Sequence, residues 1–296
     1  MRGHSRAIVL DTETTGIDPE SEATEIGWCD VFFDDHGEFK PLDKAYVQRC
    51  KPDRQIELGS MIVTHIYPED LVSEPSHRDV IPKVVDNTCT YVIGHNIDFD
   101  VNIIKNAGVT HEPKRICTLA ISRFLFPKAE NHKLSMILHL LDYDYAREHS
   151  HKAHSAKHDV IFCVRILRVI CKQQGIRSME ELYEFSERCR IPKYMPFGEH
   201  KGLPLSEIDG SYKEYMATKT EDPYLKQALE ESVRLDIENN TNLPTIMPIT
   251  KHKGELIASM AKTPAGRGTL AWIHRDDVQV STLLKMACSK ALNSTT

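Results

Sequence analysis

Two carboxylates stand two residues apart at the end of the first apolar run of the chain. The run is IVLDTETTG, residues 8–16, and it contains Asp11 and Glu13. Because side chains alternate between the two faces of a strand, these carboxylates point to the same side. They repel each other there unless a cation lies between them, and oxygen ligands are those that Mg²⁺ and Mn²⁺ prefer. For such a pair taken alone, a solvated strand end is the alternative interpretation.

Acids also follow two other apolar segments. GHNIDFD ends a predicted strand with Asp100, and HSAKHD places His154 and Asp159 at the start of the longest predicted helix. Acids from three distant segments are what two divalent cations need to hold both the attacking and the leaving oxygen of a phosphodiester. A histidine beside them can accept a proton near neutral pH. The pattern predicts metal-dependent phosphodiester hydrolysis.

The segments DTETTG, HNIDFD and HSAKHD resemble, in this order, the three motifs of the DEDDh (DnaQ-like) 3′–5′ exonuclease family. The resemblance implies a ribonuclease H-like α/β fold, with a mixed sheet flanked by helices, and release of nucleoside 5′-monophosphates from 3′ ends. It implies two Mg²⁺ or Mn²⁺ ions, four acids that bind them and one histidine that deprotonates the attacking water. These catalytic residues are Asp11, Glu13, Asp100 and Asp159 for the metals and His154 for the proton.

The resemblance also implies residues that contact the substrate. Thr14 follows the first acidic pair, and VTHIYPEDL resembles a segment whose histidine, here His65, lies against the terminal nucleotide. A likeness to exodeoxyribonuclease X over roughly residues 7–230 favours DNA, with single- or double-stranded 3′ ends. An RNA-trimming exoribonuclease of the oligoribonuclease or ribonuclease T type is the alternative, and a binding module without chemistry is a further one.

Other polar residues near the motifs have competing interpretations. His95 is expected to hydrogen-bond nearby backbone, and Asp98 to lie outside the metal site. The last motif is also crowded with histidines, which makes a transition-metal cluster an alternative use of this segment. These histidines are His149, His151, His154 and His158.

Strand and helix patterns alternate along the first part of the chain. RAIVLD, KAYVQRC and TYVIGHN predict strands, and TEIGWCDVFFDDHGEFKPL predicts a hairpin. FDVNIIKNAG, RICTLAISRFLF, KLSMILHLLD and AKHDVIFCVRILRVICKQQG predict helices. YPEDLVS and VIPKVVDNTC predict two more helices on either side of an EPSHRD turn. The catalytic domain is expected to span residues 1–180.

The tail contains an internal repeat. MPFGEHKGLPL recurs as MPITKHKGELI at an offset of 52 residues, which predicts small modules over 193–240 and 246–292. Gly202 and Gly254 are expected to make the same turn twice, with the tail aromatics Phe197 and Trp272 in the module cores. The alternative is that these aromatics and the lysines of HKG contact nucleic acid. A protein partner, such as a polymerase that uses the chain as an accessory proofreader, is also compatible with this tail.

Composition sets outer limits on function. The 296 residues carry a net charge of −6, and residues 246–296 hold seven Lys and Arg against three acids, so the remainder is strongly acidic. No apolar stretch reaches the roughly 18 residues that a membrane helix needs. Eight cysteines without CxxC spacing predict a reducing, cytoplasmic location.

Overall fold

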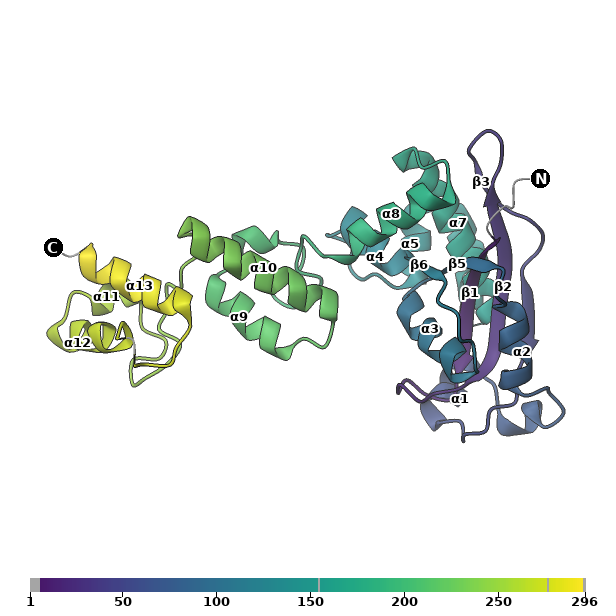
Figure 1. The fold of residues 1–296 in the computed structure, drawn as a ribbon, viewed down its shortest axis with the longest axis horizontal. Coiled ribbons are helices and arrows are strands. Elements are labelled where there is room, and N and C mark those ends of the chain that lie inside the picture. The colour runs from purple at the N-terminus through teal and green to yellow at the C-terminus, as the bar shows by residue number, and fades with distance from the viewer. Residues whose placement is uncertain (1–5, 154, 276, 295–296) are drawn as a thin grey trace. The chain divides into compact units, whose positions relative to one another are not determined.

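The computed structural model describes residues 6–153, 155–275 and 277–294 (Figure 1). The chain divides into two compact units, Met1–Arg190 and Ile191–Thr296. The first unit contains all three acidic motifs, and the second contains the repeat. Each unit is considered by itself.

The first unit is built on a six-stranded mixed sheet, with strands in the order β3-β2-β1-β5-β6 and with β4 also paired to β2. Strand β1 pairs antiparallel with β2 and parallel with β5, and β5 pairs parallel with β6. The predicted hairpin is present as β2 and β3. The strand bounds are β1 Arg6–Thr14, β2 Ala23–Phe33, β3 Phe39–Pro41, β4 Tyr46–Arg49, β5 Cys89–Gly94 and β6 Lys114–Cys117.

Helices cover both faces of this sheet, which confirms the predicted α/β class. The helix bounds are α1 Leu58–Thr64, η1 Pro68–Leu71, α2 His77–Val84, α3 Ile97–Asn106, α4 Thr118–Leu125, α5 Leu134–Leu141, α6 Tyr143–His149, η2 Ser150–Lys152, α7 Ala156–Gln174 and α8 Met179–Arg190. One core joins α2 and α3 to the face of β1 that carries Ile8 and Leu10. The other joins α7 to the opposite face, which carries Val9. Both faces of β1 are therefore buried up to the residue before Asp11.

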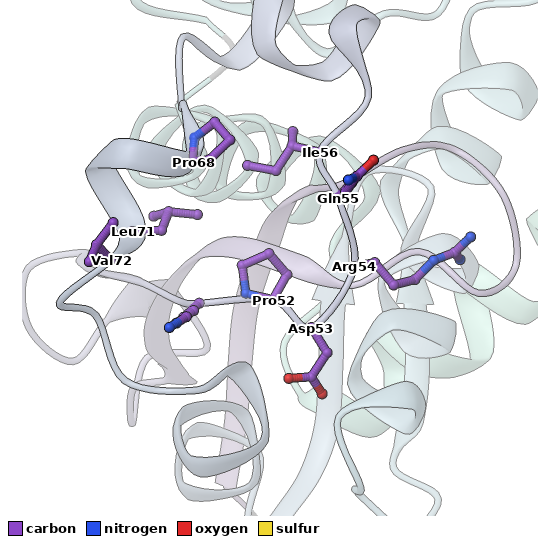
Figure 2. Close-up of a pocket in the computed structure, with 9 residues that line it drawn as sticks. Pro52, Asp53, Arg54, Gln55, Ile56, Pro68, Leu71 and Val72 are labelled. Atoms are coloured by element: carbon purple, nitrogen blue, oxygen red, sulfur yellow. The ribbon is translucent and has the colours of Figure 1, made fainter.

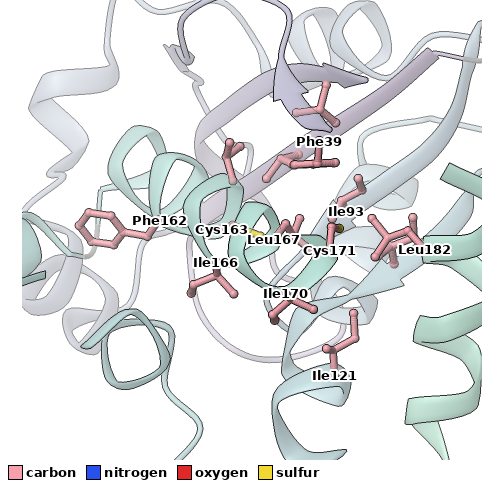
Figure 3. Packing of buried hydrophobic residues seen from close by; sticks show 14 of the residues in the cluster. Phe39, Ile93, Ile121, Phe162, Cys163, Ile166, Leu167, Ile170, Cys171 and Leu182 are labelled. Atoms are coloured by element: carbon pink, nitrogen blue, oxygen red, sulfur yellow. The ribbon is translucent and has the colours of Figure 1, made fainter. Parts of the chain in front are cut away.

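Helix α7 is the centre of the larger core (Figure 3). Its apolar side chains Phe162, Ile166 and Ile170 are at most 1% exposed, and Ile121 and Leu182 from two further helices belong to the same cluster. The helix ends at Gly175, whose φ of 68° is the left-handed conformation that glycine adopts without strain. This packing fixes the start of α7, where Asp159 lies.

Two predicted helices differ from the structure. RICTLAISRFLF is not one helix, because Arg115 and Ile116 pair with β5 as strand β6 before α4 begins at Thr118. Helix α2 begins at His77, inside the segment predicted as a turn, because Ser76 caps it by accepting from the Arg78 amide. In both cases a tertiary contact or a cap sets the boundary.

The second unit is helical, and two segments 52 residues apart form the same turn. The Gly202 amide donates to Met195 O at 2.8 Å, and the Gly254 amide donates to Met247 O at 2.9 Å. Both glycines have positive φ, 77° and 90°. The elements are η3 Leu205–Glu207, α9 Gly210–Lys219, α10 Pro223–Asn239, α11 Ile257–Met260, α12 Pro264–Ile273 and α13 Thr282–Asn293. Separate apolar clusters lie around Met195 and Met247.

The tail aromatics do not form the cores of this unit, and the expectation that they would is wrong. Phe197 is 44% exposed and Trp272 is 47% exposed. On α12 the inward positions are taken by Leu270 and Ile273, both 0% exposed, so Trp272 between them faces outward. Tyr215 on α9 is exposed in the same way.

All eight cysteines are buried. Among the described residues, no helix has both the length and the apolar character needed to cross a membrane.

Candidate active site

The site begins at the carboxyl end of β1. Asp11 and Glu13 are partly buried, while Thr12 and Thr14 between and after them are each 8% exposed. Asp11 lies opposite Gly27 and Glu13 opposite Glu25 in the antiparallel register with β2. The two acids therefore share one side of the strand, as the spacing predicts.

Gly27 lets the start of α7 approach this side of the sheet. A Cβ atom at Gly27 would lie 2.4 Å from Ala156 O and 2.9 Å from Lys157 N. Only glycine leaves room for that backbone. The close approach places Asp159, in the first turn of α7, beside the acids of β1.

Three of the four predicted metal ligands lie together. One carboxylate oxygen each from Asp11, Glu13 and Asp159 lie within 4.8 Å of one another. Asp100 is outside this group of three, but it is 4% exposed and its charge is the largest charge effect on Asp11. Its Oδ1 accepts from Thr12 N at 2.9 Å and from Thr12 Oγ1 at 2.8 Å, which fixes it against β1.

The acids share an environment that disfavours their charged forms. Burial first, and then the charges of Asp100, Asp159 and Glu13, raise the pKa of Asp11 well above its usual value. Burial and the Asp159 charge raise the pKa of Glu13 to about 7. Burial also raises the pKa of Asp100 to about 7, against the Thr12 hydrogen bonds that lower it. Such a cluster of oxygen ligands fits hard divalent cations, because their charge would remove the repulsion.

Glu25 is a further acid of this site that the sequence analysis did not identify. It is 9% exposed, lies opposite Glu13 in the antiparallel pairing of β1 with β2, and its charge raises the pKa values of Asp11 and Glu13. Burial raises its own pKa, while Arg49 and the Ala156 backbone hydrogen bond lower it. Glu25 thus links β2 to the start of α7. The alternation of side chains along β2 identifies Glu25 once the register between β1 and β2 is known.

The second motif contains residues with structural roles. His95 bonds His132 O at 2.7 Å through Nε2 and Thr118 Oγ1 at 3.0 Å through Nδ1, as expected for a histidine that holds backbone. Burial lowers the pKa of His95 to about 4. Asp98 accepts from Arg190 Nη1 at 2.5 Å and from Arg115 Nη1 at 3.3 Å. These ion pairs hold α8 and β6 to the start of α3.

The predicted proton acceptor, His154, lies outside the described residues. Among those that are described, no group of three metal-ligand side chains includes His149, His151 or His158. His149 Nδ1 instead bonds Tyr145 O at 3.0 Å, and His158 Nδ1 lies 3.4 Å from Ser155 Oγ.

The two residues expected to contact substrate differ in position. Thr14 Oγ1 donates to Gly16 O at 2.6 Å, which closes the turn directly after Glu13. His65 is exposed at the end of α1, in the left-handed conformation with φ 55°, and does not belong to the carboxylate group.

Comparison with known proteins places this site in an enzyme family. A family model described as exonuclease, RNase_T, matches residues 8–167, which include the whole carboxylate cluster. A PolC-type DNA polymerase III of Thermotoga maritima is 26% identical over 202 residues, 66% of this chain and 14% of that protein. A 3′–5′ exonuclease DinG of Staphylococcus haemolyticus is 22% identical over 73% of this chain and 24% of its own length. The chain thus spans less than a quarter of these curated relatives.

Two solved structures of exonucleases match part of this chain. Exonuclease X in complex with 5′-overhanging duplex DNA is 22% identical, with a TM-score of 0.46 over 61% of this chain and 99% of that one. E. coli exonuclease I in complex with a dA16 oligonucleotide is 18% identical, with a TM-score of 0.45 over 62% of this chain and 43% of that one.

Proposed function

The chain belongs to the RNase T family of exonucleases, and from this premise we propose that it hydrolyses the 3′-terminal phosphodiester of DNA. Two Mg²⁺ or Mn²⁺ ions, held by Asp11, Glu13, Asp100 and Asp159, are the proposed cofactors. The products are nucleoside 5′-monophosphates. The observation that carries the proposal is the group of three carboxylate oxygens within 4.8 Å, with Asp100 fixed beside it by Thr12.

The residues of the chain have distinct tasks in this proposal. When bound, the cations activate water and neutralise charge on the phosphodiester oxygens. Asp11, Glu13, Asp100 and Asp159 hold the cations, and the buried Thr12 keeps Asp100 in place. His154 accepts the proton of the attacking water.

DNA is proposed as the substrate because the chain is similar to a PolC-type DNA polymerase III. The test is a time course on three oligonucleotides of one sequence, each labelled at its 5′ end: single-stranded DNA, duplex DNA and RNA. With Mg²⁺ the DNA ladders should shorten from the 3′ end, and EDTA should stop the reaction. Faster digestion of RNA than of either DNA would instead make the chain an RNA-trimming enzyme, and no digestion of any of them would reject the nuclease proposal.

The second motif offers a matched pair of variants. Asp100→Asn should lower kcat/KM at least 100-fold, because it removes a proposed metal ligand, whereas Asp98→Asn should stay within about 5-fold of wild type. Asp98 bonds two arginines and lies outside the carboxylate group, so its loss changes local stability rather than chemistry. Assays are run well below the melting temperature of each variant. Equal loss in both variants would remove Asp100 from the metal site.

A further inference from the structure

A second set of metal-ligand side chains lies outside the carboxylate cluster. One ligand atom each from Glu22, Asp53 and His77 lie within 4.8 Å of one another. They come from three parts of the chain. Glu22 directly precedes β2, Asp53 lies between β4 and α1, and His77 is the first residue of α2. The separation is 3.7 Å from His77 Nε2 to Glu22 Oε2 and 3.9 Å from His77 Nε2 to Asp53 Oδ2.

His77 is the feature that separates this group from an ordinary cluster of surface acids. It is 0% exposed, and neither of its ring nitrogens has a hydrogen-bond partner among the described residues. A buried imidazole normally bonds through at least one nitrogen, because an unsatisfied buried polar atom costs roughly 1–3 kcal/mol. An imidazole nitrogen that faces two carboxylates at these distances offers a metal ion one nitrogen ligand beside two oxygen ligands.

The backbone already fixes two of the three ligands. Glu22 is 5% exposed, and its Oε2 accepts from Asp53 N at 2.6 Å and from Arg54 N at 2.9 Å. Lys51 O accepts from the His77 amide at 3.1 Å. The segment that carries Asp53 is therefore tied to both Glu22 and the start of α2 before any ion binds.

We propose that Glu22, Asp53 and His77 bind one Zn²⁺. Zinc takes four ligands at about 2.0–2.1 Å, which places neighbouring ligand atoms about 3.3 Å apart. The observed separations of 3.7 and 3.9 Å reach this value with shifts of about half an ångström. Water completes the coordination.

The donor set explains the choice of metal. The proposed catalytic site offers only carboxylates, which suit Mg²⁺ and Mn²⁺, whereas an imidazole beside two carboxylates favours a borderline ion such as Zn²⁺. Arg78 is the competing cation here. Its Nε donates to Asp53 Oδ2 at 3.1 Å, and its Nη2 lies 3.4 Å from Glu22 Oε1. Both carboxylates keep lone pairs for a metal, since each accepts up to about four hydrogen bonds.

The site would tie down the segment that leads into α1. Pro52, Ile56 and Leu71 line a pocket of about 400 Å³. Figure 2 shows these side chains, with Asp53 directed away from them. The Glu57 amide, one residue before α1, donates to Thr15 O at 2.8 Å, next to the first acidic motif. Bound Zn²⁺ therefore stabilises the connection between the turn after β1 and α1, without entering the chemistry.

The experiment measures zinc binding by the full chain. The purified protein is stripped with EDTA, dialysed, and titrated with Zn²⁺ in millimolar Mg²⁺ against a chromogenic chelator. Wild type should bind one more Zn²⁺ per chain than Asp53→Asn and His77→Gln. Asp53 is 66% exposed, so Asp53→Asn should fold even if the buried His77 variant does not. Zn²⁺ should also raise the melting temperature of wild type and leave that of Asp53→Asn unchanged.

Asp18→Asn is the matched control, because Asp18 bonds Arg54 of the same segment at 2.9 Å and offers no atom to the cluster. It should bind Zn²⁺ as wild type does. Arg78→Gln should tighten zinc binding several-fold by removing the competing cation. The proposal is overturned if Asp53→Asn and Asp18→Asn bind equal numbers of Zn²⁺, or if wild type binds none. Neither result depends on nuclease activity.

Discussion

At the scale of single residues, the acids of the proposed catalytic site lower the stability of the protein when no metal is bound. The pKa of Glu13 is about 7 in the folded chain, against 4.5 for an ordinary glutamate. Because the folded value is raised, the folded state binds this proton more tightly than the unfolded state does. Protonated Glu13 therefore stabilises the folded state fully below pH 4.5, and this contribution is lost as the pH rises through 7. The loss is on the order of 3 kcal/mol for a shift of this size.

Glu13→Gln isolates this effect. Other groups titrate in the same range: His95, with a lowered pKa of about 4, gains stability as the pH rises toward 6.5. The difference between wild type and Glu13→Gln cancels such terms. Urea unfolding in EDTA should show Glu13→Gln gaining on wild type between pH 5 and pH 8. Added Mn²⁺ should shrink that gain at pH 8. A difference that is flat with pH would mean that Glu13 is not in a repulsive cluster.

At the scale of elements, the sequence predicts which segments carry the acids but not how closely they pack. The three motifs end or begin apolar elements, and this much follows from periodicity. The contact of α7 with β2 does not, because it depends on Gly27 in the middle of a strand, where a glycine has no local signal. The sequence also does not reveal Glu25, because its position opposite Glu13 depends on the register in which β1 pairs with β2. Strand β6 was missed because RIC continues into an apolar helix without a break.

Gly27→Ala tests whether this packing positions Asp159. The added Cβ would lie 2.4 Å from Ala156 O, a backbone atom that moves only if the start of α7 moves. We expect kcat/KM to fall at least 10-fold and the free energy of unfolding to fall by about 1–3 kcal/mol. Gly268→Ala in α12 is the control, since a Cβ there meets nothing within 4 Å, and it should be neutral or slightly stabilising. Wild-type activity in Gly27→Ala would show that α7 does not need this approach.

At the scale of the whole molecule, the two units differ in how much of their structure the sequence predicts. In the first unit, the acidic motifs, the strand patterns and the apolar helix patterns are all consistent with one fold. In the second unit, the repeat predicts the shared turn through Gly202 and Gly254. The prediction that Phe197 and Trp272 point into the module cores is wrong. Helical periodicity identifies an apolar stripe without saying which large side chain lies beside it. Phe197, Tyr215 and Trp272 are all exposed.

These exposed aromatics and the basic residues of the tail predict a role in holding DNA. Residues 246–296 carry seven Lys and Arg against three acids, and Lys251 and Lys253 are exposed. A chain ending at Arg190 keeps both cores of the first unit. It should bind DNA at least 10-fold more weakly than the full chain at low salt, with a shallower dependence of log Kd on log salt. The slope falls by about 0.9 for each duplex phosphate contact that is lost.

The turnover of the shortened chain separates binding from chemistry. At saturating oligonucleotide its kcat should stay within about 3-fold of the full chain, because every proposed metal ligand precedes Arg190. In the full chain, Trp272→Ala should reproduce part of the loss of affinity, since base stacking on an exposed aromatic is worth about 1–3 kcal/mol. Fluorescence anisotropy across a salt series measures both effects. Equal affinity and equal salt slope in the two chains would assign the tail to a protein partner instead, because a surface that neutralises no phosphate leaves no salt signature.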